Sequence, residues 1–378
     1  MLAIGLMSGT SLDGVDAALV EINETNLKDV RFNLVKYILL PYDEKFRMKI
    51  MRNLSNETAK LSEVCSLNFE LGYKFKDAID LLLDGTSYKY SDIDFVASHG
   101  QTIWHNPKQN GDLIPSTLQI GEASVITVLT NIKTVSNFRC ADIVAGGEGA
   151  PLVPMSEYMM FKEENKNVIL QNIGGIGNLT CLFKNGTIND VIAFDTGPGN
   201  VIIDYFTNKY FGIPYDDGGN VALSGKVIKE VFDELIKDEY IYTVPPKSTG
   251  REKYSKEALE LLAKQYNFEK YEKKDIITTV TEYTAYTIMY AYDTFIKEVD
   301  KVIIGGGGSH NKYIVNRLKD YYGKDVVYTQ DELGYSSDAK EAIAFVVLGY
   351  LSLNGKYGNV KSATGAKKDV VLGNVTLI

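Results

Sequence analysis

Residues 5–16 read Gly5-Leu6-Met7-Ser8-Gly9-Thr10-Ser11-Leu12-Asp13-Gly14-Val15-Asp16, and this stretch decides the fold. It joins two apolar runs, Leu2–Met7 and Val15–Ile22, that are typical of buried strands. The polar segment between them ends in Asp13-Gly14, a common turn pair in β-hairpins. The chain is therefore predicted to open with a β-hairpin whose tip consists of small and polar residues.

The glycine spacing of this tip approaches that of a P-loop, but Val15-Asp16 replaces the obligatory Lys-Ser/Thr pair. A Walker-type nucleotide site is thereby excluded. The tip can still bring backbone N–H groups and two hydroxyls against phosphate oxygens, with Asp13 and Asp16 available to a hydrated Mg²⁺. An ordinary hairpin turn is the alternative interpretation.

Four further apolar runs lead directly into glycine-containing turns. They are Phe95–Ser98 before His99-Gly100, Val168–Leu170 before Gly174-Gly175, Val191–Phe194 before Gly197-Pro198-Gly199, and Val302–Ile304 before Gly305–Gly308. Between these runs, apolar residues recur at helical spacing over residues 61–82, 227–235, 275–299 and 338–353. Strands that alternate with helices predict an α/β architecture with partly parallel sheets.

The length of 378 residues suits two domains, each with its own core. A strand followed by a Gly/Thr/Asp turn occurs near residue 8 and again near residue 195, which is compatible with two related domains that face each other across a cleft. We expect an N-terminal domain of residues 1–135 plus 356–378 and a C-terminal domain of residues 136–355.

Composition and charge argue against several classes of protein. The net charge of −9 argues against an electrostatic nucleic-acid footprint, and no apolar run approaches the roughly 18 residues of a membrane span. The three cysteines lie far apart, so neither a disulfide framework nor a zinc site is expected. The N-terminal residues lack the basic start of a signal peptide, so we expect a cytoplasmic protein.

Asp195 is the sharpest candidate for chemistry, because its carboxylate ends a buried strand and precedes the Gly197-Pro198-Gly199 turn. Open α/β sheets bind ligands at such strand ends, and the glycines let a ligand approach the backbone. An N-cap of the following helix is the alternative role. Gly305–Gly308 would let a flat ring or a ribose lie against the backbone, although the spacing is not that of a dinucleotide fingerprint.

Two segments have the composition of a sugar site. His99–His105 contains Trp104 as an apolar platform, and a packed Trp between solvated histidines is the alternative. Arg139 precedes the Gly146–Pro151 loop, a combination suited to an anionic group. Glu341 stands before an apolar run that would bury it in part. The absence of a Ser/His/Asp arrangement with a nucleophile elbow argues against a serine hydrolase.

Taken together, these segments resemble the anhydro-N-acetylmuramic acid kinase family over almost the whole chain. The motifs that carry the resemblance are Gly5–Asp16, His99–Thr102, Leu118–Glu122, Gly146–Pro154, Asn172–Asn178 and Phe194–Asn200. That family belongs to the actin/hexokinase/Hsp70-like ATPase superfamily. The resemblance therefore implies a two-domain, actin/hexokinase-like (ribonuclease H-like) α/β fold with an ATP cleft between the domains.

The resemblance also implies roles for individual residues. Asp195 would be the general base, and Glu341 would help to hold the attacking water. The substrate-binding residues would be Gln101, Thr102, Arg139 and Gly149. ATP would be bound by Gly9, Thr10, Ser11, Leu12, Asp13, Gly14, Val15, Asp16, Gly175, Gly197, Gly305, Gly306, Gly307 and Gly308. Mg²⁺ would be held through Asp13 or Asp16 and water.

The implied reaction opens the 1,6-anhydro bridge of 1,6-anhydro-N-acetylmuramic acid with water and phosphorylates O6 with ATP. The products are N-acetylmuramic acid 6-phosphate and ADP, in cell-wall recycling. A kinase of levoglucosan, which lacks the N-acetyl and lactyl groups, is the alternative enzyme, and an actin-like or Hsp70-like ATPase is the alternative class. Expected partners are the anhydrosugar and a second copy of the chain in a homodimer, with neither nucleic acid nor membrane.

The chain departs from the family's usual pattern at two positions. Asn137 stands where Asp is usual, and Glu148 stands where Gln is usual. Both lie beside the sugar site that the resemblance implies, so they bear on substrate preference and leave the phosphate and base motifs unchanged.

Overall fold

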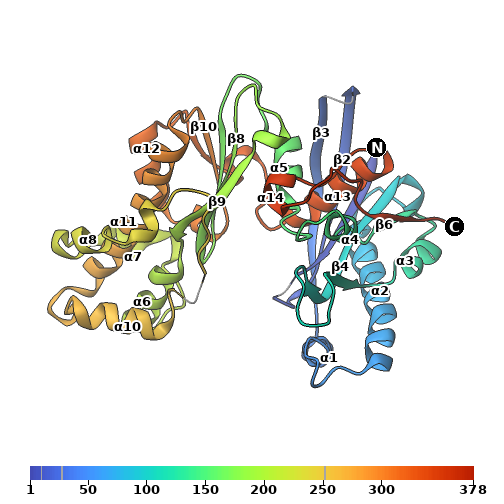
Figure 1. The fold of residues 1–378 in the computed structure, drawn as a ribbon, viewed down its shortest axis with the longest axis horizontal. Helices are drawn as coiled ribbons and strands as arrows, with labels where there is room; N and C mark the ends of the chain where they lie inside the picture. The colour runs from blue at the N-terminus through green and yellow to red at the C-terminus, as the bar shows by residue number, and fades with distance from the viewer. Residues whose placement is uncertain (10, 27–28, 251–252) are drawn as a thin grey trace. The chain divides into compact units, whose positions relative to one another are not determined.

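The computed structural model describes residues 1–9, 11–26, 29–250 and 253–378. Contacts divide the chain into two compact units, and each unit is built on one mixed β-sheet (Figure 1). Unit 1 comprises Met1–Phe161 and Asp338–Ile378, and unit 2 comprises Lys162–Ser337. The predicted α/β class with partly parallel sheets is confirmed.

The sheet of unit 1 begins with the predicted hairpin. Its strands are β1 (Leu2–Ser8), β2 (Gly14–Asn26), β3 (Asp29–Pro41), β4 (Phe95–Asn106), β5 (Ser116–Ile120), β6 (Thr134–Ser136) and β12 (Asn374–Thr376). The strand order is β12-β6-β4-β1-β2-β3, and β5 pairs with β4. β1, β2 and β3 form an antiparallel meander, whereas β4 is parallel to both β1 and β6. The hairpin prediction is confirmed, and β3 extends it.

Helices of unit 1 pack on both faces of this sheet. The helices are α1 (Glu44–Arg52), α2 (Leu61–Leu83), α3 (Ala123–Thr130), α4 (Cys140–Val144), α5 (Val153–Phe161), α13 (Lys340–Leu353) and α14 (Lys361–Thr364). Successive side chains of a strand point to opposite faces. Ile4 and Leu6 of β1 are buried in one core cluster with the apolar side of α2, whereas Gly5 between them lies against Ala342 of α13. The predicted helices over 61–82 and 338–353 are confirmed.

Gly5 permits a close approach of α13 to β1. A Cβ atom at this position would lie 1.9 Å from the carbonyl oxygen of Ala342, which is part of the backbone and cannot rotate away. We expect Gly5→Ala to destabilise unit 1 by about 1 to 3 kcal/mol, the usual cost of overpacking. Urea unfolding followed by fluorescence measures this loss, because Trp104 is the only Trp and belongs to unit 1. Gly9→Ala is the control, since the nearest atom to its Cβ would be 3.8 Å away. Equal stability of the two variants would contradict the explanation.

Unit 2 has a second sheet and its own set of helices. Its strands are β7 (Val168–Ile173), β8 (Ile176–Leu182), β9 (Ile192–Pro198), β10 (Lys301–Gly305) and β11 (Val327–Thr329). Its helices are α6 (Val201–Phe211), α7 (Asn220–Ser224), α8 (Lys229–Leu235), α9 (Glu239–Tyr242), α10 (Lys256–Gln265), α11 (Lys273–Ala291) and α12 (Lys312–Tyr322). The predicted helix over 275–299 corresponds to α11, which is buried along most of its length and packs against α7, α12 and β9. The helix predicted over 227–235 corresponds to α8.

Five strands of the unit 1 sheet, β6-β4-β1-β2-β3, have the same connectivity as the sheet of unit 2. In unit 2 the order is β11-β10-β7-β8-β9, with β7, β8 and β9 antiparallel and β10 parallel to β7 and β11. Each unit thus has a three-stranded meander followed by two parallel strands, which is the expected ribonuclease H-like arrangement. The two units are therefore similar in topology, as predicted. The hairpin tip of unit 1, however, corresponds to the Gly174-Gly175 turn between β7 and β8 and not to the turn near residue 195, because Asp195 belongs to β9, the third strand of the meander.

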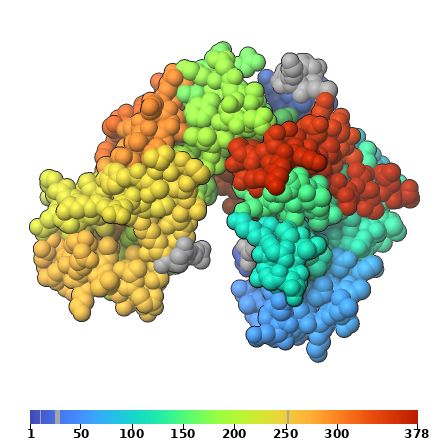
Figure 2. All heavy atoms as spheres, viewed as in Figure 1, coloured from blue at the N-terminus to red at the C-terminus, as the bar shows by residue number. Residues whose placement is uncertain are grey.

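The unit boundaries differ from the expected domains, because residues 136–161 and 338–355 belong to unit 1. The reason is packing, since α13 lies against β1 and β4 while α5 lies against α13. Figure 2 shows the C-terminal residues, in red, against green residues of the same unit, and β12 pairs with β6. The ATP cleft expected between domains stays a prediction. No helix within the described ranges is long and apolar enough to cross a membrane.

Candidate functional site

The hairpin tip of unit 1 is a tight and partly buried turn. The N–H of Leu12 donates to the carbonyl of Gly9 (3.3 Å), and the N–H of Tyr42 donates to the carbonyl of Asp13 (2.9 Å). Leu12 has a φ of 58° and a buried side chain. Ser11 and Asp13 are exposed, so the side of the tip that faces solvent is polar.

Gly14 was expected in the hairpin turn, but it is the first residue of β2. A Cβ atom there would lie 2.2 Å from the carbonyl oxygen of Leu40 in β3. The glycine is therefore required by the close approach of two strands. Val15 is buried in the sheet next to it. Thr10, which was predicted to bind ATP, lies outside the described residues.

A buried chain of hydrogen bonds links the start of the tip to Gln101. The hydroxyl of Ser8 donates to Oε1 of Gln101 (2.6 Å), and it lies 2.8 Å from the hydroxyl of Tyr42. Since Ser8 has one hydroxyl proton, Tyr42 donates to Ser8 and Ser8 donates to Gln101. This chain fixes the amide orientation of Gln101, whose Nε2 donates to the carbonyl of Thr102 (3.3 Å).

Several carboxyl groups of unit 1 influence one another next to the hairpin tip. The hydroxyl of Tyr37 donates to Oδ1 of Asp16 at 2.5 Å. Burial raises the pKa of Asp16, the bond from Tyr37 opposes this rise, and the charges of Asp338 and Asp13 add to it. Burial also raises the pKa of Glu341, and the charge of Asp16 contributes to that rise. Partly buried carboxylates that repel one another are the groups that a divalent cation stabilises.

Arg139 is oriented by two uncharged partners. Its Nε donates to Nε2 of His99 (2.9 Å), and its Nη1 donates to the carbonyl of Gly149 (2.7 Å). Nδ1 of His99 lies 2.8 Å from the carbonyl oxygen of Gly100, which can only accept. The hydrogen-bond pattern therefore places the imidazole proton on Nδ1 and leaves Nε2 as an acceptor. Burial lowers the pKa of His99 to about 3, so the imidazole stays neutral at physiological pH.

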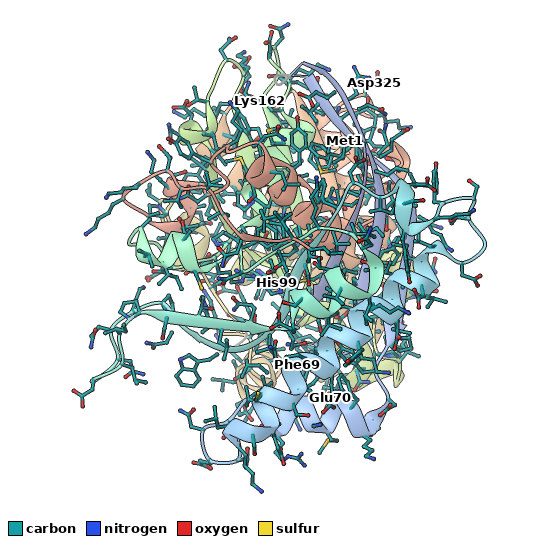
Figure 3. All side chains as sticks on the ribbon, turned by 90° about the vertical axis from the view of Figure 1, so that its right-hand side faces the viewer. Met1, Phe69, Glu70, His99, Lys162 and Asp325 are labelled. Carbon is teal, nitrogen blue, oxygen red and sulfur yellow. The ribbon has the colours of Figure 1, made fainter. Side chains whose placement is uncertain are left out.

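His99 is a buried and uncharged partner of Arg139. His99 is 3% exposed, in the interior of unit 1 (Figure 3), and its ring centroid lies 4.7 Å from that of Phe345 in α13. The alternative of two solvated histidines is therefore contradicted at His99, although His105 is exposed. Burial lowers the pKa of Arg139 and the charge of Glu341 opposes this effect. Because neither hydrogen-bond partner is an anion, the remaining guanidinium donors suit an anionic ligand.

A buried carboxylate fixes the Gly146–Pro151 loop. Asp142 accepts hydrogen bonds from the N–H of Gly149 (2.8 Å) and from the side chains of Asn359 (2.9 Å) and Thr364 (2.8 Å). Since Arg139 binds the carbonyl of the same glycine, Gly149 is held on both sides. Three of the predicted substrate-binding residues, Gln101, Arg139 and Gly149, are thus held in place by hydrogen bonds to other residues of unit 1.

The two positions that depart from the family pattern have local explanations. Asn137 has a φ of 60°, a left-handed conformation that Asn adopts more readily than most residues. Glu148 forms an ion pair with Lys108 (2.7 Å) in which both side chains are well exposed.

Thr102, the fourth predicted substrate-binding residue, lies on β4 and accepts a hydrogen bond from Gln119 of β5 (3.3 Å).

Asp195 occupies an interior position of β9 in unit 2, opposite Asn178. The strand continues to Pro198, so the carboxylate does not end it as predicted, and Asn200 is the N-cap of α6. The capping alternative for Asp195 is therefore excluded. Its Oδ2 accepts a hydrogen bond from the N–H of Thr249 (2.9 Å). Burial raises the pKa of Asp195, and the bond from Thr249 opposes the rise.

The glycine-rich turns of unit 2 meet at the end of β7. The N–H of Gly199 donates to the carbonyl of Gly175 (2.9 Å). Gly306 and Gly308 lie against Ile173, where added Cβ atoms would be 2.9 Å from its carbonyl oxygen and 2.2 Å from its Cγ2. The remaining predicted glycines lie nearby in the fold, with Gly197 against Thr287, Gly305 against Gln330 and Gly307 near Asn200. These glycines let the turns pack closely on their neighbours at the end of β7, and strand ends of such sheets are where ligands commonly bind.

The segment that supplies Thr249 was missed by the sequence analysis. It reads Pro245-Pro246-Lys247-Ser248-Thr249-Gly250, a group of turn-forming residues between two helical stretches. Such clusters mark loops, and loops on a rigid scaffold often carry functional residues. That composition was the available signal, but nothing in it points to Asp195.

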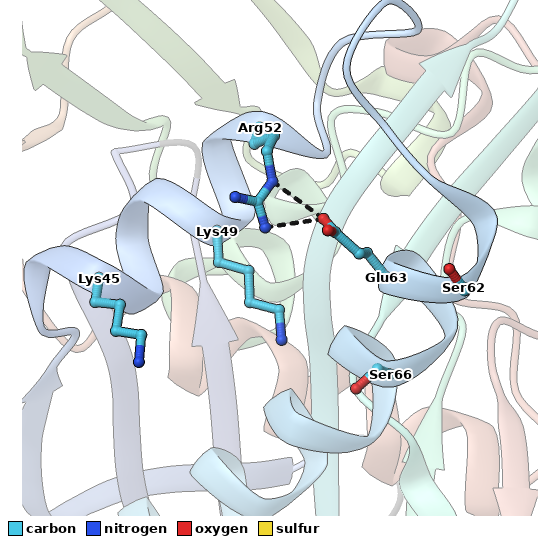
Figure 4. A pocket seen from close by; sticks show the side chains of 6 residues that line it. All are labelled: Lys45, Lys49, Arg52, Ser62, Glu63 and Ser66. Atoms are coloured by element: carbon cyan, nitrogen blue, oxygen red, sulfur yellow. Dashed lines mark hydrogen bonds and ion pairs between the residues drawn. The ribbon is translucent and has the colours of Figure 1, made fainter.

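A separate surface hollow lies between α1 and α2 (Figure 4). It has a volume of about 410 Å³ and is lined by Lys45, Lys49, Arg52, Ser62, Glu63 and Ser66. Arg52 pairs with Glu63 (2.9 Å) and Lys49 pairs with Glu70 (2.6 Å). None of the predicted site residues lines the hollow, and we assign it no role in the reaction.

Two ribonuclease H-like units with glycine-rich turns define a protein of the actin/hexokinase-like class. The family profile of anhydro-N-acetylmuramic acid kinase matches residues 1–377. The chain belongs to this family and is a kinase. It is 47% identical over 379 residues to the anhydro-N-acetylmuramic acid kinase of Clostridioides difficile (strain 630), with 100% of this chain and 98% of the relative covered. It is 45% identical over 383 residues to that of Bacillus cereus (strain Q1), with 100% and 99% covered.

Similarity to solved structures is more remote. The activator of the 2-hydroxyisocaproyl-CoA dehydratase from Clostridium difficile with bound ADPNP has a TM-score of 0.44 and 11% identity, over 94% of this chain and 98% of that chain. A ROK family glucokinase from Streptomyces griseus in complex with glucose and AMPPNP has a TM-score of 0.38 and 9% identity, over 92% and 99%. The assignment to the family therefore rests on sequence.

Proposed function

We propose that the chain uses ATP and water to convert 1,6-anhydro-N-acetylmuramic acid into N-acetylmuramic acid 6-phosphate and ADP, in cell-wall recycling. The observation that carries this proposal is the family match over residues 1–377. The contacts described within each unit support it, because they are compatible with the roles that follow for Asp195, the hairpin tip and Arg139. The homodimer and the cytoplasmic location stay predictions.

Asp195 is the general base in this proposal. Its Oδ2 is bound by the N–H of Thr249, and Oδ1 takes a proton from the water that attacks C1 of the sugar. The bond between C1 and O6 breaks, O6 attacks the γ-phosphorus of ATP, and ADP leaves. The proton of the water stays on Asp195 and is later released to solvent, so the atoms and charges balance. The raised pKa of Asp195 makes it a stronger base than an exposed aspartate.

The hairpin tip of unit 1 binds phosphate oxygens through its backbone N–H groups and the hydroxyl of Ser11 in this proposal. Asp13 and Asp16 are the residues that would hold Mg²⁺, through water. In the part of the chain that the structure describes, no group of three or more His, Cys, Asp or Glu side chains could hold a metal. The two carboxylates of Asp13 and Asp16 therefore suit an ion whose other ligands are phosphate oxygens and water, as is usual for Mg²⁺. When bound, the ion neutralises charge on the transferred phosphoryl group.

The substrate roles follow from the charge near Arg139. We assign Arg139 to the carboxylate of the lactyl group, because neither of its two hydrogen-bond partners is an anion and its other guanidinium donors suit a carboxylate. Levoglucosan has no such carboxylate, so the levoglucosan alternative gives Arg139 no partner. An actin-like or Hsp70-like ATPase without a sugar site would give no role to Arg139 beside the Gly146–Pro151 loop.

The test is ADP release from ATP in the presence of each sugar, with the mass of the product measured. We expect turnover with 1,6-anhydro-N-acetylmuramic acid and a product heavier by one phosphoryl group and one water. Levoglucosan at the same concentration is expected to give little ADP. Turnover with levoglucosan alone, or ADP release that is independent of any sugar, would contradict the proposal.

A further inference from the structure

The 247–249 segment of unit 2 lies alongside β9 at Asp195 and holds it by two hydrogen bonds. The N–H of Asp195 donates to the carbonyl of Lys247 (3.2 Å), and the N–H of Thr249 donates to Oδ2 of Asp195 (2.9 Å). The first bond fixes the register of the segment against the strand. The second bond reaches the carboxylate itself, so the direction of that carboxylate depends on where this segment lies.

The side chain of Lys247 ties the same segment to its neighbours. Its Nζ donates to the carbonyls of Tyr240 (3.1 Å) and Ile241 (2.9 Å). The ammonium also lies over aromatic rings, 4.8 Å from the centroid of Tyr240, 5.1 Å from that of Phe295 and 5.8 Å from that of Phe194. Cations at such distances are attracted by the ring faces. Phe194 immediately precedes Asp195, so the lysine contacts the strand that carries the carboxylate.

Tyr240 closes this arrangement from the other side. Its hydroxyl donates to the carbonyl oxygen of Asp195 (2.9 Å). One residue therefore contacts Asp195 through its hydroxyl, accepts a bond from Lys247 through its carbonyl, and packs on the ammonium through its ring. Removal of the ammonium would loosen several contacts that converge on Asp195.

Lys247 is bound by main-chain carbonyls, whereas the nearby charged groups pair with one another. Burial lowers the pKa of Lys247 to about 8, while the charge of Asp238 raises it and that of Lys253 lowers it. Asp238 is itself paired with Lys253 (2.6 Å) and bound by the hydroxyl of Tyr283 (3.1 Å). The ammonium of Lys247 is instead bound by main-chain carbonyls, so its protonated form stabilises a particular path of the 240–249 segment.

We propose that Lys247 is a positioning residue for the Asp195 carboxylate. By joining residues 240–241 to the rings beside β9, it holds the N–H of Thr249 on Oδ2 and directs Oδ1 toward the reacting water. This inference rests on the proposed role of Asp195 as the base. Loss of the contact affects the proton transfer step, and it leaves the hairpin tip of unit 1 unchanged.

Lys247→Met tests the proposal, because Met keeps an apolar chain among the rings and removes the donors and the charge. We expect kcat to fall by roughly 10²-fold, the order associated with misplacement of a catalytic group, with KM for ATP within about twofold. Lys247→Arg retains a cation with several donors that stacks on aromatic rings, and it should keep more activity than the Met variant. Lys237→Met, which removes an exposed lysine of the same unit, is the matched control.

The pH profile separates positioning from a purely structural effect. The N–H of Thr249 opposes the rise in the pKa of Asp195, so its loss in Lys247→Met should move the acid limb of kcat/KM to higher pH. A Lys247→Met enzyme with wild-type kcat and an unmoved acid limb would overturn the proposal. If this variant does not fold, as judged by circular dichroism, Lys247→Gln replaces it under the same criterion. Full activity of Asp195→Asn would instead overturn the assignment of the base.

Discussion

Asp195→Asn is expected to lower kcat by roughly 10²- to 10⁴-fold, the range that a general base contributes. The amide is nearly the size of the carboxylate and can keep an oxygen toward the N–H of Thr249, so the local structure should persist. It cannot take a proton from the attacking water. Steady-state ADP release measures the loss, and calorimetric titration with ATP should give an affinity within about twofold of the wild type.

The control for this variant is Asp190→Asn. Asp190 is an exposed residue of unit 2 whose carboxylate binds the N–H and the hydroxyl of Thr187. It shares the residue type and the unit of Asp195 without a place in the proposed reaction, so its kcat should be unchanged. Substantial turnover by Asp195→Asn would show that another group is the base.

The pH dependence of the wild-type enzyme follows from the same carboxylate. Burial raises the pKa of Asp195 above that of an exposed aspartate. The base acts when deprotonated, so kcat/KM is full above this raised pKa and declines as the pH falls through it. Burial also raises the pKa of Glu341. The profile of Glu341→Gln therefore tests the assignment. We expect the acid limb to persist in this variant, and its disappearance would assign the limb to Glu341 and contradict the assignment to Asp195.

The parts of the fold that sequence could predict are those with local signals. Apolar runs that end in glycine turns predicted the strands that carry Gln101, Thr102 and Asp195, and helical periodicity predicted α2 and α13. The unit boundary could not be predicted, because the packing of α13 on β1 depends on Gly5 meeting Ala342, residues at opposite ends of the chain. Nothing in either local sequence indicates that contact.

The candidate site divides in the same way. Asp195 stands out from its neighbours by residue type and by the glycines that follow it, and Arg139 stands out by its charge ahead of the Gly146–Pro151 loop. The residues that orient them do not, because Thr249 lies 54 positions from Asp195 and His99 lies 40 positions from Arg139. The sequence places His99 in a segment with the composition of a sugar site, but the neutral imidazole with Nε2 as an acceptor depends on burial and on the carbonyl of Gly100. Such partners are fixed only by tertiary structure.

Arg139→Met is expected to lower kcat/KM for the anhydrosugar by about 10- to 150-fold, which corresponds to the 1.5–3 kcal/mol of a hydrogen bond to a charged group. Met fills much of the same volume and removes the charge, while KM for ATP should stay within about twofold. His99→Phe should have a smaller effect in the same direction. It keeps a ring against Phe345 and removes the acceptor that orients the guanidinium.

A substrate analogue shows whether Arg139 acts on the carboxylate. Replacement of the lactyl carboxylate by a carboxamide removes the charge that we assign to Arg139. Wild-type enzyme should lose about as much kcat/KM on this analogue as Arg139→Met loses on the natural sugar, whereas the variant should scarcely distinguish the two sugars. Coupling of this kind between a residue and a substrate group is the signature of direct interaction in a double-mutant cycle. Additive losses would place the carboxylate elsewhere and leave Arg139 as a support for Gly149, whose carbonyl it binds in either case.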